Sequence, residues 1–107
     1  MGFRIANLPR MEFLRLEAMA SGNLCLNLSE NVNWEDFEAY ATSLLHALRA
    51  KKIKVADSVE MRLWDISIEG EPFALVWNDF PAMVSLESST TEGDAILRRL
   101  ASDLGVA

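Results

Sequence analysis

The chain has 107 residues and a mass of 12.0 kDa, a length typical of one domain. Half of its residues are apolar and 24% are charged, which is a globular composition and excludes a disordered chain or a disulfide scaffold. Ten Lys and Arg residues stand against 16 Asp and Glu residues, so the net charge is −6. This acidic balance argues against nucleic-acid binding, which depends on basic residues. We expect one domain over residues 1–107, with residues 1–10 as a lead-in segment.

The cysteine count and the hydropathy indicate in which cellular compartment the protein is found. Cys25 is the only cysteine, which excludes an intrachain disulfide and fits a reducing environment. Residues 1–10 lack the continuous apolar region of a signal peptide. No apolar run approaches the roughly 18 residues of a membrane span. The sequence predicts a cytoplasmic protein that does not bind membranes.

The N-terminal half predicts a hairpin and a helix. Apolar and polar residues alternate over residues 11–18 and 23–28, with a turn between these two strands. Asn33 is a favoured helix N-cap, and an apolar stripe of helical spacing follows it. A basic cluster (Arg49, Lys51, Lys52 and Lys54) is expected at the C-terminal end of this helix, where cations stabilise the helix dipole.

The C-terminal half predicts strands and a second helix. Strands are expected at 59–68, 73–77 and 82–87, with an uncertain short strand at 53–55. The apolar phase slips by one residue near 63–65, which predicts a β-bulge there. Thr91 and Asp94 form a weak capping pair for the final helix.

The order of these elements is ββαβββα, not counting the uncertain strand. Short turns favour antiparallel neighbours. The expected fold is an α+β two-layer domain, in which an antiparallel sheet of about five strands carries both helices on one face.

Five short segments give the chain a family resemblance: Leu24–Leu28, Trp34–Phe37, Asp57-Ser58 with Leu63-Trp64, Phe73–Asp79 and Ser85–Glu87. Together they resemble a family of small stand-alone bacterial proteins that is known as a domain of unknown function, over most of residues 24–104. The resemblance implies a compact α+β fold and a bacterial cytoplasmic home, and it implies no activity, ligand or catalytic residue. A looser similarity links the chain to small acidic immunity-type proteins, which bind and block a toxin.

The residues give little support to catalysis. His46 is the only histidine and falls on the exposed side of the predicted helix, where no partner orients it as a base. Cys25 lies mid-strand, without a nearby histidine or helix N-terminus to activate it. No phosphate-binding loop, cofactor motif or metal-ligand spacing is present. A carboxylate site with a divalent ion, held by Asp65 and Asp79, is the remaining enzymatic alternative.

Two features are candidates for an interaction surface. The first is the predicted outer face of the first helix, where small side chains would permit close approach, although an alanine-rich solvent face is the plainer interpretation: Ala39, Ser43, His46, Ala47 and Ala50. The second is the acidic stretch 57–94, which holds nine acidic residues and one basic residue, Arg62.

Within that stretch, Trp64 at the expected bulge is a candidate interface anchor beside Asp65, with a core position as the alternative. Trp34 and Trp77 are expected in the core.

The expected function is therefore that of a small acidic, non-enzymatic binding or regulatory domain that contacts another protein. An acidic surface suits a basic partner, with attraction that weakens as salt rises. The main alternative is a homodimer that forms through the first helix or through an exposed sheet edge.

Overall fold

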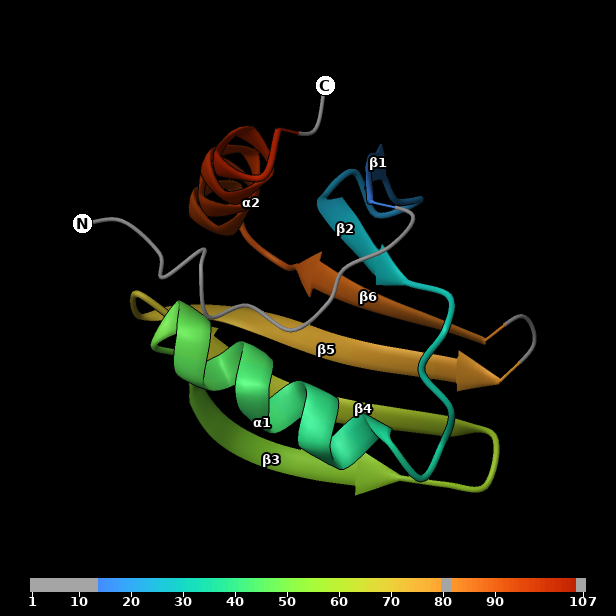
Figure 1. Cartoon of the computed structure of the whole chain (residues 1–107). Coiled ribbons are helices and arrows are strands. Elements are labelled where there is room, and N and C mark those ends of the chain that lie inside the picture. Colours follow the sequence, from blue (N-terminus) through green and yellow to red (C-terminus); the bar gives the residue numbers. More distant parts are fainter. Residues whose placement is uncertain (1–13, 80–81, 106–107) are drawn as a thin grey trace.

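Figure 1 shows a computed structural model of the chain, which describes residues 14–79 and 82–105. Six strands and two helices lie in this part of the chain, in the order ββαββββα: β1 (Arg15–Ala18), β2 (Leu24–Ser29), α1 (Phe37–Leu48), β3 (Lys51–Asp57), β4 (Met61–Ile68), β5 (Glu71–Asp79), β6 (Ala82–Ser88) and α2 (Thr91–Asp103). The predicted lead-in at 1–10 and the start of the first predicted strand lie outside these residues. No helix in the described ranges is long and apolar enough to cross a membrane.

The strands form one antiparallel sheet in the order β1-β2-β6-β5-β4-β3. The β1-β2 hairpin joins the rest of the sheet through the pairing of β2 with β6, in which Leu26 lies opposite Leu86. The α+β fold and the antiparallel sheet are confirmed. The sheet has one strand more than the five expected, because the short apolar pair at 53–55 belongs to a full seven-residue strand, β3.

Side chains alternate between the two faces of the sheet, and both helices lie on one of them (Figure 1). That face holds the core, whose largest fully buried members include Phe37, Leu26, Leu75 and Leu86. We call the opposite face, which neither α1 nor α2 covers, the open face. Several side chains of the open face are nevertheless buried, among them Cys25, Val76 and Ser85.

The basic cluster does not lie on the first helix. The helix ends at Leu48, because Arg49 adopts a left-handed conformation (φ 55°) and its backbone N–H donates to the carbonyls of His46 and Leu45. Lys51, Lys52 and Lys54 then lie in β3, an exposed edge strand of the sheet.

The prediction of a β-bulge at residues 63–65 of β4 is wrong. β4 pairs with β5 without interruption from Met61 to Ile68, and the register shift lies in β3, between Lys52 and Lys54. The residues of β4 that face the core include Arg62, whose side chain lies at a position that an apolar residue usually occupies. The apolar pattern slips because of this arginine, not because a residue is inserted.

Both helices begin at a residue other than the predicted one. Asn33 caps a turn, since its Oδ1 accepts from the backbone N–H of Asp36 at 2.9 Å, and α1 itself starts at Phe37. Thr90 is the N-cap of α2, and its Oγ1 accepts from the N–H of Gly93 at 2.8 Å. Asp94 is thereby free to contact β2 instead of capping its own helix.

Candidate functional site

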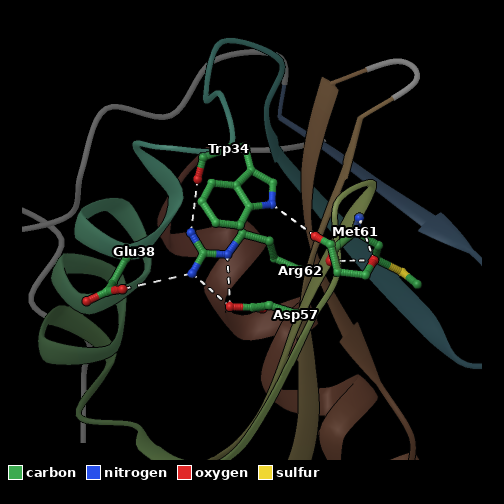
Figure 2. Close-up of polar contacts among 6 residues, drawn as sticks. Trp34, Glu38, Asp57, Met61 and Arg62 are labelled. Atoms are coloured by element: carbon green, nitrogen blue, oxygen red, sulfur yellow. Dashed lines mark hydrogen bonds and ion pairs between the residues drawn. The ribbon is translucent and has the colours of Figure 1, made fainter.

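Arg62 is a charged residue at the margin of the core, with only 6% of its surface exposed. Its Nε and Nη2 both donate to Oδ2 of Asp57, at 3.0 and 2.8 Å, and its Nη1 donates to the carbonyl of Trp34 at 2.9 Å (Figure 2). Glu38 in the first turn of α1 lies 3.9 Å from Nη2. A buried guanidinium is tolerated only when its charge and its donors are satisfied in this way. Arg62 therefore joins β3, β4 and the start of α1.

The same guanidinium stacks on aromatic rings. Its Cζ lies 4.4 Å from the ring centroid of Trp34 and 5.3 Å from that of Phe37. Phe37 in turn meets Trp64 edge to face, with centroids 5.6 Å apart, and Lys52 lies over Trp64 at 4.8 Å. Cations and aromatic rings thus form a continuous packed series from the start of α1 to the edge strand.

Trp34 is the exposed tryptophan of the described chain, with 38% of its surface accessible. Its Nε1 donates to the carbonyl of Ser58 at 3.0 Å, and one ring face rests on Arg62 (Figure 2). The indole is bound at its polar atom and at one face, and part of the remaining ring surface is open to solvent. The prediction of a core position is therefore wrong for Trp34, although it is confirmed for Trp77, which is 2% exposed.

Trp64 does not project from a bulge. It is 3% exposed and points into the core under α1. Because β4 is regular, Trp64 lies on the same face of the strand as Arg62, two residues before it. Its role as an interface anchor is excluded by this burial. Of the two positions considered for Trp64, the core position is the observed one, and the tryptophan that is exposed is Trp34.

A groove of about 390 Å³ lies beside Trp34 at one end of the sheet. Its apolar lining includes Trp34, Trp77 and Val59, of which Val59 is 86% exposed. Its carboxylates are those of Glu30, Glu35 and Asp79, all of which are exposed. We call this feature the Trp34 groove. It combines an aromatic anchor with an acidic rim, a combination typical of sites that bind cationic groups.

The open face carries a row of side chains that crosses all six strands in register: Glu17, Cys25, Glu87, Ala74, Asp65 and Lys54. Burial, together with the negative charges of Glu17 and Glu87, raises the pKa of the Cys25 thiol. Burial also raises the pKa of Glu87. A thiol whose pKa is raised is less often present as the thiolate, which is the nucleophilic form.

Asp65 lies in this row, beside a hollow of about 370 Å³ that also includes Ala74 and Glu87. Asp79 lies elsewhere, because it belongs to the inward phase of β5 at the far end of that strand and lines the Trp34 groove. The structure therefore does not bring these two carboxylates together. Among the described residues, no group of three or more His, Cys, Asp and Glu side chains is placed to hold a metal ion.

The outer face of α1 is smaller than predicted. Ala39, Ser43 and His46 are exposed as expected. Ala47 is fully buried, because it lies only about 60° around the helix from Leu44 and its short side chain is enclosed at the border of the core. Ala50 follows the end of the helix and packs against the core. The expectation that Ala47 and Ala50 belong to an exposed helical face is wrong.

The residue patterns indicate neither the exposed position of Trp34 in the groove nor the buried position of Arg62, which supports the Trp34 ring. The phase slip in β4 was the available signal, since an arginine between apolar positions of a strand produces the same slip as an inserted residue. Nothing in the pattern distinguishes the two, because the partners of Arg62 come from Trp34, Glu38 and Asp57, which lie in other elements.

Comparison with known proteins gives one match. A family model described as "Protein of unknown function (DUF3630)" matches residues 14–104, which is most of the chain. No curated protein and no solved structure matches.

Proposed function

Because the chain belongs to the DUF3630 family, whose description names no activity, the function has to be argued from the molecule, and we propose that it is a small non-enzymatic domain that binds another protein. The observation that carries the proposal is Trp34, an exposed tryptophan held rigidly at the wall of a groove. Tryptophan is among the residues that contribute most to protein interfaces. A ring that is already fixed loses little conformational entropy when a partner covers it.

A binding role also fits the positions of the reactive side chains. His46 lies on the outer side of α1, and Cys25 points to the open face on the other side of the sheet. A histidine and a thiol on opposite sides cannot form a nucleophile–base pair. The free thiol of Cys25 suits a reducing compartment, which supports a cytoplasmic location in this proposal.

Site-specific photo-crosslinking tests this function. A benzophenone amino acid replaces Val59, which lines the groove, or Ala95 on the exposed side of α2 as a matched control. After irradiation in the source cells, we expect a discrete adduct from position 59 and none from position 95. Trp34→Ala in the position-59 protein should remove the adduct, and the backbone carbonyl that binds Arg62 is unchanged by this substitution.

Two results would speak against the proposal. Equal adducts from both positions, or none from position 59, would show that the groove does not select a partner. An adduct with twice the mass of the chain would identify a second copy as the partner and would replace the proposal by the homodimer.

A further inference from the structure

The charged residues that the structure describes in the lining of the Trp34 groove are all acidic. Of its described lining residues, Glu30, Glu35 and Asp79 are acidic and none is basic. Arg62 lies on the other side of the Trp34 ring and donates two hydrogen bonds to Asp57. The carboxylate of Asp57 therefore largely balances the positive charge of Arg62. A partner that covers the groove must therefore remove water from three carboxylates, which is costly unless the partner supplies positive charge.

The free surface of Trp34 favours the same kind of ligand. Arg62 occupies one face of the indole, so the exposed part of the ring belongs to its other face and its edge. The electron-rich face of tryptophan is the strongest aromatic binder of cations among the side chains. The indole N–H already donates to Ser58 and is not available to an acceptor on the ligand.

We infer that the Trp34 groove receives an arginine side chain from a basic segment of the partner protein. This inference rests on the proposed binding function and names the chemistry of the partner. The planar guanidinium stacks on the open face of Trp34, as Arg62 does on the other face, while its N–H groups point to the carboxylate rim. Arginine fits better than lysine, because a flat guanidinium both stacks on a ring and pairs with a carboxylate through two parallel hydrogen bonds.

Nuclear magnetic resonance titration of the ¹⁵N-labelled full chain tests this inference. The probe is a capped peptide with two arginines separated by glycine. The controls are the same peptide with lysine, and with citrulline, which has the shape of arginine without its charge. We expect saturable shifts of the Trp34 indole N–H and of backbone amides near Val59 and Asp79. The citrulline peptide should bind at least tenfold more weakly, and the lysine peptide at an intermediate strength.

Variants locate the binding. Trp34→Ala should abolish the saturable shifts, and Asp79→Asn should weaken binding at least threefold without a change in fold. Glu92→Gln removes an exposed carboxylate of the first turn of α2 and should leave the affinity unchanged. Raising the salt from 50 to 500 mM should weaken the arginine peptide several-fold.

The inference is overturned if citrulline binds as well as arginine, if no saturable shift appears at millimolar peptide, or if the shifts gather on the open face around Asp65 and Glu87. A partner that crosslinks at position 59 through a neutral segment would refute the inference that an arginine enters the groove. The proposed binding function would still hold. The absence of any crosslink from position 59 in the protein that keeps Trp34 would instead refute the binding function.

Discussion

Arg62 shows how one side chain decides the geometry of a surface. Its guanidinium is bound by Asp57 and by the carbonyl of Trp34, and it supports the indole ring from behind. A leucine of similar size would leave the Asp57 carboxylate without its partner, although 21% of that side chain stays exposed to water. The cost of a broken ion pair of this kind comes mainly from the partner that is left behind.

We expect Arg62→Leu to lower the free energy of unfolding by about 3 kcal/mol, because removing one member of a buried ion pair typically costs 3–5 kcal/mol and Asp57 is partly solvated. Urea denaturation followed by circular dichroism measures the change. Arg99→Leu is the matched control, since Arg99 forms an exposed ion pair with Glu69 and such pairs contribute about 1 kcal/mol or less. Equal losses in the two variants would contradict the structural role of Arg62.

At the scale of elements, α2 is joined to β2 through a carboxylate. Oδ1 of Asp94 accepts from the backbone N–H of Leu24 at 2.9 Å, and Oδ2 accepts from Nδ2 of Asn23 at 3.3 Å. Burial raises the pKa of Asp94, but the hydrogen bonds from Leu24, Ser88 and Asn23 and the charge of Arg98 outweigh it, so the pKa lies below the ordinary 3.8. The charged form is therefore favoured by folding.

A lowered pKa gives stability that is complete above pH 3.8 and is lost as the pH falls through the lowered value. We expect Asp94→Asn to reduce the free energy of unfolding at pH 7 by about 1–2 kcal/mol, the range for a hydrogen bond to a charged group. The difference from the unmodified chain should shrink as the pH falls below 3.8. Urea titrations at pH 7 and pH 3 check this, with Asp103→Asn at the exposed end of α2 as the control. A difference that does not depend on pH would show that the charge of Asp94 is unimportant.

The edge strand β3 combines exposed apolar and basic side chains. Ile53 is 64% and Val55 is 43% exposed, and Lys51, Lys52 and Lys54 lie in the same strand. Lysines and a bulge on an edge strand are the usual means by which a protein prevents edge-to-edge pairing. The lysines would also repel one another if two β3 strands met, which disfavours a dimer through this edge.

Replacement of Lys51, Lys52 and Lys54 by threonine should therefore promote self-association, because threonine favours strands and removes the repulsion. Light scattering of the protein over a micromolar concentration range should show larger particles for this variant than for the unmodified chain. The triple arginine variant keeps the charge and should behave like the unmodified chain. Identical scattering from the threonine and arginine variants would contradict the protective role of these lysines.

At the scale of the whole molecule, the sequence predicted the layers better than the surface. Alternation at period 2 and stripes at helical spacing identify β2, β6 and both helices, because in these elements one side faces the core, whereas β5 is identified by its continuous apolar run over 73–77. The same criterion does not identify β3, because none of its seven residues is buried. Its hydropathy pattern therefore does not mark one side as facing the core. Its existence follows from pairing with β4, which is a contact between segments.

The candidate binding surface was less predictable for a related reason. Asp79 was expected to take part in binding, and it lines the groove. Trp34 lines the groove too, but nothing in the sequence marks it as an exposed residue. A tryptophan before a helix has the same local pattern whether its ring is buried or open. The outcome depends on Arg62 and Ser58, which lie more than 20 residues away and fix the ring at the surface.

The pairing of β2 with β6 has a consequence for the order in which the molecule folds. Cys25 and Glu87 face each other across 62 residues of chain, so β2 has no inner neighbour in the sheet until β6 has been synthesised. On a ribosome, the β1-β2 hairpin must wait while the hairpins of β3, β4 and β5 form from nearby segments. A two-stranded hairpin is marginal by itself, and distant pairings are slow to form. Refolding should therefore be limited by the docking of this hairpin, and its apolar side stays accessible to chaperones until the last strand arrives.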